Sequence, residues 1–433
     1  MFYIYMKKED ILKFLDSWNF WNNNPNVGIK REFYANRIEN FLEDSEIPIL
    51  IETGIRRAGK SFIAKQVAKD LVEKNFAKSR ILIINLEDER LIDRNYTTLL
   101  EIYQAYKEVV NPSETSIVIL DEAQEIDGWE HFVRGLSEKG EAKFIVTGSS
   151  SKLLDSEFSS LLSGRQVVVY VHPLNALEFK LFSRNQNPMN RFIMEGGFPA
   201  VVLSRVKTEL VSSYFDTIIL KDVIQRFRIK KQGSLIKLAK FYVTSVGSKI
   251  TFRSISKFLD LPVKTVYNFS IYLEAAYLIF FVDRFSYSAK KSDKSPRKVY
   301  SIDNSFPSFL GINPIEIKGR LLENAVAGTL YLISRHVLEF KFYYWNENNR
   351  EVDFIMRHGH DYEALQVAYS VNNERTRTRK VEELLDCASR LNLASVMIVT
   401  MDYSYQETIN DITINYIPAA EWIERKLKQY GIA

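Results

Sequence analysis

The sequence predicts an α/β fold that begins with a parallel sheet, and three observations support this prediction. Apolar runs of strand length alternate with helical patterns between residues 47 and 171, which is typical of parallel strands joined by helices. The length of 433 residues is enough for about three domains at the usual ~100–200 residues per domain. The composition, with 46% hydrophobic and 26% charged residues, is that of a folded globular protein.

The pattern along the chain divides it into four regions. Residues 1–172 hold N-terminal helices and the predicted parallel sheet, with strands expected at 47–51, 81–86, 117–120, 144–146 and 167–171. Residues 173–233 predict a helical lid. Residues 234–305 show the order helix, helix, turn, helix and two strands, which is the order of a winged helix. Residues 306–433 mix helices and strands and predict an α+β domain.

Several classes of protein are excluded by composition. Cys387 is the single cysteine, which excludes a disulfide framework within one chain and a cysteine-based metal site. The apolar start of the chain is shorter than a signal-peptide core of ~7–15 residues, and the run 275–282 is shorter than a membrane span of ~20 residues. We therefore expect a cytoplasmic protein with no membrane partner.

Charge is distributed unevenly along the chain. Residues 1–130 carry 17 Lys and Arg against 23 Asp and Glu, whereas residues 221–300 carry 17 Lys and Arg against 5 Asp and Glu. A concentrated basic segment attracts nucleic acid more strongly than a small overall net charge does. Residues 221–300 are therefore the candidate nucleic-acid segment.

A glycine-rich motif follows the first predicted strand and precedes a helix. The pattern G-x-x-x-x-G-K-[ST] is present as Gly54-Ile55-Arg56-Arg57-Ala58-Gly59-Lys60-Ser61, and its backbone N–H groups at a helix N-terminus are suited to phosphate oxygens. We expect Lys60 to reach the β- and γ-phosphates of ATP and Ser61 to bind Mg²⁺. The loop, together with Phe62, is the predicted nucleotide contact.

Acidic and hydroxyl side chains follow two later strands. Asp121 and Glu122 end the apolar run 117–120; the first is suited to hold Mg²⁺ and the second to act as the general base for the attacking water. Thr147 and Ser149 follow the strand at 144–146 and are suited to orient the γ-phosphate, although a simple turn would have the same residues. Arg165 is suited to stabilise phosphoryl charge, with a solvated arginine as the alternative.

Five segments together resemble those of archaeal and bacterial AAA-type ATPases with a DUF4143-like C-terminal region: GIRRAGKS, ILDEAQEIDGWE, FIVTGSSSKLL, LSGRQVVVYVHPLNALEF and GGFPAVV. The resemblance implies a P-loop NTPase of the AAA+/STAND class rather than a metabolic kinase. It also implies that Pro199, in the Gly197-Phe198-Pro199 segment of the lid, lies near the adenine. Residues 28–32 are a looser match to a nucleotide-contacting segment ahead of the first strand.

The winged-helix region offers candidate DNA contacts. The helix expected at residues 263–276 carries Lys264, Thr265, Tyr267 and Asn268 near its start. Side chains of these types reach the phosphates and base edges of double-stranded DNA. Basic residues also lie where a wing would contact the phosphate backbone, namely Lys290, Lys291, Lys294, Arg297 and Lys298. The alternative is that this region packs against the lid and its lysines form a solvated surface.

The last region resembles the restriction-endonuclease-like core of the same family. Glu323 on a helix and Asp353 on a strand match two of its metal ligands, whereas Gln366 and Ala368 stand where the E-x-K motif has Glu and Lys. One anionic ligand and the activating cation are therefore missing, unless Glu363 or Lys380 replaces them. The departure favours a degenerate nuclease fold kept for binding or assembly over an active nuclease.

The leading hypothesis is a Mg²⁺-dependent ATPase whose core and lid drive a winged helix and a nuclease-like domain. Two alternatives stay open: a nucleotide-switched DNA-binding regulator with little turnover, and an active ATP-dependent nuclease. The sequence also leaves open a homo-oligomer in which Arg165 acts on a neighbouring subunit.

Overall fold

The computed structural model describes residues 7–149, 164–183, 187–288, 295–311 and 317–432. The chain forms two compact units, Met1–Val171 and His172–Ala433. Each unit has its own sheets and core, and each is described by itself.

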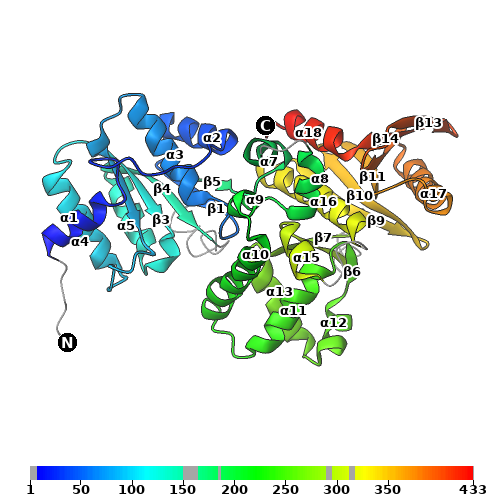
Figure 1. The fold of residues 1–433 in the computed structure, drawn as a ribbon, viewed down its shortest axis with the longest axis horizontal. Helices are drawn as coiled ribbons and strands as arrows, with labels where there is room; N and C mark the ends of the chain where they lie inside the picture. The colour runs from blue at the N-terminus through cyan, green and yellow to red at the C-terminus, as the bar shows by residue number, and fades with distance from the viewer. Residues whose placement is uncertain (1–6, 150–163, 184–186, 289–294, 312–316, 433) are drawn as a thin grey trace. The chain divides into compact units, whose positions relative to one another are not determined.

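The first unit is a parallel sheet between two layers of helices (Figure 1). Its strands are β1 (Ile49–Thr53), β2 (Ile81–Asn85), β3 (Ser116–Asp121), β4 (Ala142–Gly148) and β5 (Gln166–Tyr170). Its helices are α1 (Lys8–Asp16), α2 (Glu32–Glu43), α3 (Lys60–Glu73), α4 (Tyr96–Val109) and α5 (Trp129–Glu138), with 3-10 turns η1 (Lys78–Arg80) and η2 (Ala123–Glu125).

The strand order β2-β3-β4-β1-β5 places one strand, β4, between the strand before the glycine-rich loop and the strand that ends in Asp121. All pairs are parallel, so the carboxyl ends of the strands lie at one edge of the sheet. Helices α1, α4 and α5 pack on one face, and α2 and α3 pack on the other. Buried apolar side chains on both faces explain why the strands are apolar throughout rather than alternating.

The second unit begins with helices and continues with two sheets. The helices before residue 245 are α7 (Ala176–Ser183), α8 (Pro188–Glu195), α9 (Pro199–Leu203), α10 (Lys207–Thr217), the π-helix η4 (Ile218–Gln225) and α11 (Gln232–Thr244). A small antiparallel sheet with order β6-β8-β7 follows, made of β6 (Ser248–Ile250), β7 (Ile279–Val282) and β8 (Arg297–Ser301). Helices α11, α12 (Phe252–Leu259) and α13 (Val263–Ala275) pack together beside it.

A six-stranded mixed sheet forms the rest of this unit, in the order β13-β14-β12-β11-β10-β9. Its strands are β9 (Phe340–Glu347), β10 (Arg350–His358), β11 (Asp361–Ala368), β12 (Ser395–Thr400), β13 (Tyr405–Ile409) and β14 (Ile412–Pro418). Helix α17 (Glu374–Leu391) covers one face, and α16 (Lys318–His336) and α18 (Ala419–Gln429) cover the other, while α15 (Ser305–Leu310) precedes α16.

The two sheets of the second unit are joined by main-chain hydrogen bonds. The N–H of Phe285 donates to Tyr344 O at 2.7 Å, and the N–H of Tyr344 donates to Asp283 O at 3.1 Å. The Phe280 ring stacks on Tyr331 of α16 with centroids 4.3 Å apart. The predicted boundary at residues 305 and 306 therefore crosses a region where both sides share one core.

The α/β fold class is confirmed, and the structure adds elements that the sequence patterns did not predict. Strands β6, β13 and β14 and helix α18 are additional. No helix in the described parts of the chain is long and apolar enough to cross a membrane.

Two glycines fix the turn that precedes α9. Gly196 has φ +77°, and a Cβ there would lie 2.0 Å from Asp303 Oδ1; a Cβ on Gly197 would lie 2.2 Å from Leu174 O. The Asp303 carboxylate accepts a hydrogen bond from the N–H of Gly197 at 2.6 Å and from the N–H of Ser305 at 2.9 Å. This turn therefore requires glycine and is held by Asp303.

The substitution Gly196→Ala tests this close approach, with Gly359→Ala as a matched control. Gly359 also has a positive φ, +60°, but a Cβ there would meet nothing within 4 Å. Gly196 also has ψ −172°, a backbone conformation that is essentially restricted to glycine, and only Gly196→Ala displaces Asp303. We therefore expect Gly196→Ala to lose about 1–3 kcal/mol more stability than Gly359→Ala. Urea unfolding followed by circular dichroism measures the difference; equal losses would contradict the role of Asp303.

Candidate functional site

The glycine-rich loop lies at the carboxyl end of β1, between the strand and the first turn of α3. Gly54 has φ +149°, and a Cβ there would lie 2.0 Å from Val171 O, so only glycine fits. Gly59 caps α3 with φ 106°. The loop therefore brings backbone N–H groups close to the positive end of the helix dipole, and this arrangement is suited to binding phosphate.

Lys60 and a second cation lie against this loop. The Lys60 ammonium donates to Gly54 O at 3.0 Å and to Ile55 O at 3.1 Å. The Arg31 guanidinium, buried beneath the loop, donates to Ala58 O at 2.7 Å. Arg31 comes from the segment 28–32, and a Cβ on Gly28 of that segment would lie 3.2 Å from the Phe62 ring. The segment 28–32 therefore packs against the glycine-rich loop and the first turn of α3.

Ser61 and Asp121 are the predicted metal-binding group, and Thr147, a predicted γ-phosphate contact, lies against them. The Ser61 hydroxyl donates to Asp121 Oδ1 at 2.7 Å, and the Thr147 hydroxyl donates to the same oxygen at 2.7 Å. Mg²⁺ prefers hard oxygen ligands and usually takes one or two from side chains, so the Ser61 and Asp121 oxygens fit this ion. Three segments far apart in sequence meet here because β1, β4 and β3 are parallel neighbours.

Glu122 lies beside this group in an unusual backbone conformation. Its φ of 59° and ψ of 54° are left-handed, which turns its side chain away from the strand direction. The main-chain N–H of Glu122 donates to the Thr147 hydroxyl at 3.1 Å, and Gln124 donates to its carboxylate. Burial raises the pKa of Glu122, although the Lys60 and Arg56 charges oppose this effect. A raised pKa suits a proton acceptor.

Arg56, within the loop, contacts two acidic side chains. Its guanidinium lies 2.9 Å from Glu87 Oε1 and 3.9 Å from Glu122 Oε2. Ser149 is buried, and Gln124 donates to its hydroxyl at 3.5 Å. Ser149 is thus linked to Glu122 through Gln124.

Glu52 is a buried acid that the sequence analysis missed. It lies on β1 opposite Thr147 of β4 and has no exposed surface. Within the described residues neither of its carboxylate oxygens has a hydrogen-bond partner. Burial, and then the nearby Asp121, raise its pKa well above the ordinary value. The available signal was an acidic residue inside an apolar strand immediately before a glycine-rich loop.

Arg165 is not brought to the phosphate loop of its own chain. It precedes β5, whose first residue pairs with Ile49 at the start of β1, so it lies at the opposite edge of the sheet from the loop. Its guanidinium contacts Glu138 Oε1 at 2.6 Å, and its side chain is 53% exposed. Action within one chain is therefore wrong for this geometry, whereas action on a neighbouring subunit stays a prediction. Pro199 begins α9 in the second unit, and its contact with adenine also stays a prediction.

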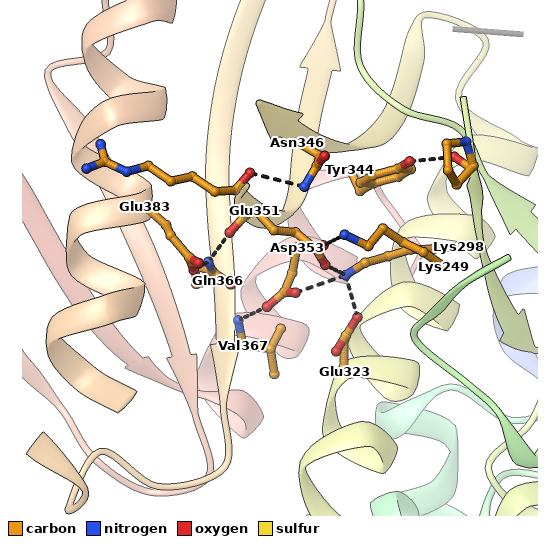
Figure 2. Close-up of polar contacts among 12 residues, drawn as sticks. Lys249, Lys298, Glu323, Tyr344, Asn346, Glu351, Asp353, Gln366, Val367 and Glu383 are labelled. Carbon is orange, nitrogen blue, oxygen red and sulfur yellow. Dashed lines mark hydrogen bonds and ion pairs between the residues drawn. The ribbon is translucent and has the colours of Figure 1, made fainter. Parts of the chain in front are cut away.

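The predicted nuclease residues meet in the second unit around a lysine (Figure 2). The Lys298 ammonium lies 3.1 Å from Glu323 Oε1, 2.8 Å from Glu351 Oε1 and 3.0 Å from Asp353 Oδ1. Lys298 is 1% exposed, so the predicted contact between this lysine and DNA phosphate is wrong. The sequence analysis did not include Glu351, which lies on β10 two residues before Asp353.

Of the two candidate replacements for the missing motif residues, Lys380 lies beside Asp353 and Gln366, whereas Glu363 does not. The Lys380 ammonium lies 3.2 Å from Asp353 Oδ2 and 2.9 Å from Gln366 Oε1. The Gln366 amide donates to Glu383 Oε2 at 3.0 Å. Glu363 instead pairs with Lys426 of α18 at 2.8 Å. In the described part of the chain, no group of three or more acidic, histidine or cysteine side chains is arranged to hold a metal ion.

The predicted DNA-contacting residues lie on α13. Lys264 and Tyr267 are exposed, whereas Thr265 and Asn268 are half-buried. Tyr267 packs edge-on against Phe252 of α12 with centroids 5.4 Å apart. Arg297 pairs with Asp283 at 2.9 Å. Lys290, Lys291 and Lys294 lie outside the described residues.

Comparison with known proteins gives three family matches along the chain. Residues 46–180 match an AAA domain, residues 187–315 a domain of unknown function (DUF8612) and residues 318–422 a domain of unknown function (DUF4143). The match at residues 46–180 covers the glycine-rich loop and the acidic pair.

Two proteins with similar sequences match nearly the whole chain. The uncharacterized protein MJ1544 of Methanocaldococcus jannaschii is 31% identical over 417 residues, which cover 91% of this chain and 90% of that protein. An uncharacterized protein of Haemophilus influenzae is 26% identical, and the match covers 91% of this chain and 98% of that protein. Among solved structures, the Walker-type ATPase PABY2304 of Pyrococcus abyssi is similar with a TM-score of 0.45 and 15% identity, covering 68% of this chain and 99% of that one. The chain therefore belongs to the family of proteins that combine an AAA domain with a DUF4143 domain.

Proposed function

We propose that the protein binds ATP with Mg²⁺ and hydrolyses it. The contact of Ser61 with Asp121, directly below the glycine-rich loop, carries this proposal. When bound, Mg²⁺ would neutralise phosphate charge and fix the geometry of the phosphoryl group. Ser61 and Asp121 would hold the ion, and Lys60 would bind the phosphates.

Glu122 is the proposed general base. Its carboxylate lies next to the metal-binding group, and Gln124 and Arg56 fix its orientation. The Thr147 hydroxyl accepts a hydrogen bond from the Glu122 main chain and donates one to the Asp121 carboxylate, so one residue fixes the Asp121 side chain and the Glu122 backbone. This arrangement would allow Glu122 to accept a proton from water while Asp121 holds the metal.

Substitutions in the loop and at the acidic pair test ATP binding and hydrolysis separately. Lys60→Ala removes a charged phosphate contact, so we expect ATP affinity to fall at least about tenfold in calorimetry. Glu122→Gln keeps the size of the side chain but removes the base. We therefore expect unchanged ATP binding and an ATP turnover that falls by roughly 100-fold or more.

Matched controls lie on the same elements. Lys69→Ala on α3 and Glu125→Gln in the turn after Glu122 remove exposed or partly exposed ion pairs, and both should behave like the parental protein. Parental turnover in Glu122→Gln would assign the base to another residue. The absence of ATP binding by the folded parental protein would overturn the whole proposal.

We further propose that the second unit contacts double-stranded DNA through α13, in the manner of a winged helix. The support is the excess of basic residues in 221–300 together with the exposed Lys264 and Tyr267. In this alternative, nucleotide occupancy regulates DNA binding and turnover is low. A solvated basic surface without DNA affinity is the competing interpretation.

A salt titration of duplex binding, with and without ATP, distinguishes these interpretations. Electrostatic binding weakens linearly with the logarithm of salt concentration, and Lys264→Ala should reduce that slope by about 1. Lys428→Ala on α18 is the control, since its pairing with Glu424 lies on another element. Absence of duplex binding at low salt would remove the DNA proposal.

The DUF4143 region is proposed to be a nuclease-like domain without nuclease activity. Gln366 replaces an anionic ligand, and a lysine lies among the remaining acidic side chains. We expect plasmid DNA to stay uncut in Mg²⁺ or Mn²⁺, as measured by gel electrophoresis. Cleavage that Asp353→Ala eliminates would show instead that the domain is an active nuclease.

A further inference from the structure

A fully buried lysine in the second unit pairs with three carboxylates. Lys298 comes from β8 of the small sheet, Glu323 comes from α16, and Glu351 and Asp353 come from β10 of the large sheet. One oxygen of each carboxylate lies 2.8–3.1 Å from the same nitrogen. Figure 2 shows these side chains converging on the Lys298 ammonium.

The local backbone brings the carboxylates and the lysine together. The register of β10 against β9 shifts between Val352 and Ile355, so Asp353 lies in an irregularity of the strand, and such irregularities redirect side chains. Asp353 Oδ2 accepts the main-chain N–H of Val367 at 2.9 Å, which leaves Oδ1 for Lys298. A Cβ on Gly247 would lie 3.0 Å from Glu323 Oε1, so a glycine gives Glu323 its space.

The charges of the cluster are compensated within the protein. Burial would lower the pKa of Lys298, but the neighbouring Glu323, Tyr300 and Asp353 raise it well above the ordinary value, so the amine is charged. Lys380 contacts the second oxygen of Asp353, and Lys249 lies 2.7 Å from the second oxygen of Glu351. Three ammonium groups thus face three carboxylates.

We propose that the Lys298 ammonium is the resident cation of this carboxylate cluster, filling the position in which Glu323, Glu351 and Asp353 would otherwise bind a divalent metal ion. Carboxylate oxygens bind Mn²⁺ or Ca²⁺ at about 2.1–2.6 Å, so a contraction of less than about 1 Å would convert the lysine position into a metal position. The native domain therefore needs no metal, and β8 is fixed to α16 and β10 by charge. This inference is independent of the proposed ATPase activity.

Replacing the lysine should make the second unit dependent on a divalent cation. In Lys298→Ala three carboxylates lose a buried counter-ion, so we expect the thermal midpoint in EDTA to fall by roughly 10 °C. Mn²⁺ should restore at least half of this loss, because the ion can enter the space left by the side chain. Nucleotide-free parental protein, measured in the same two buffers, corrects for any Mn²⁺ bound elsewhere.

Lys249→Ala is the matched control. Lys249 pairs with the same Glu351 but is 42% exposed, so its loss should cost little and should create no Mn²⁺ dependence. A Lys298→Ala protein that is as stable as the parental protein, or that Mn²⁺ stabilises no more than it stabilises the parental protein, would overturn the proposal.

A second variant decides the case in which Lys298→Ala does not fold. In Lys298→Ala/Glu323→Gln one unpaired carboxylate is gone, so we expect this protein to be recovered folded in EDTA and to respond less to Mn²⁺. Failure of both variants to fold, with or without Mn²⁺, would show that the lysine is required for packing rather than as a cation, and would also overturn the proposal.

Discussion

One oxygen of Asp121 organises the nucleotide end of the first unit, because it accepts hydrogen bonds from both Ser61 and Thr147. Ser61 belongs to the helix after the glycine-rich loop, and Thr147 ends the strand between β1 and β3. The same threonine accepts the Glu122 N–H. The loop, the proposed metal-binding oxygens and the proposed general base therefore keep their relative positions only while β1, β4 and β3 keep their parallel register.

The second unit depends on a different kind of interaction. Its buried carboxylates would be costly without partners, and Lys298 compensates them from another sheet. This explains how three acidic side chains can lie close together in the interior of this unit. Residues on both sides of position 305 are joined a second time by the main-chain hydrogen bond between Phe285 and Tyr344.

The sequence was most informative where local patterns carry the chemistry. The glycine-rich loop and the acidic strand end have fixed spacing, so Lys60, Ser61, Asp121 and Glu122 were predicted without any long-range information. Glu351 and the burial of Lys298 could not be predicted, because the partners are 25 to 55 positions apart along the chain and their meeting depends on how two sheets pack. The position of Arg165 was predictable, because it comes just before the expected parallel strand at 167–171 and therefore lies at the amino end of the sheet, away from the loop.

The interlocked core of the second unit also limits how this protein can diversify. A recombination event that exchanged residues up to 305 for those of a relative without a lysine at position 298 would leave the carboxylates on α16 and β10 without their cation. Such a chimaera would carry a charge imbalance in its core. Inheritance should therefore keep the two halves of this unit together.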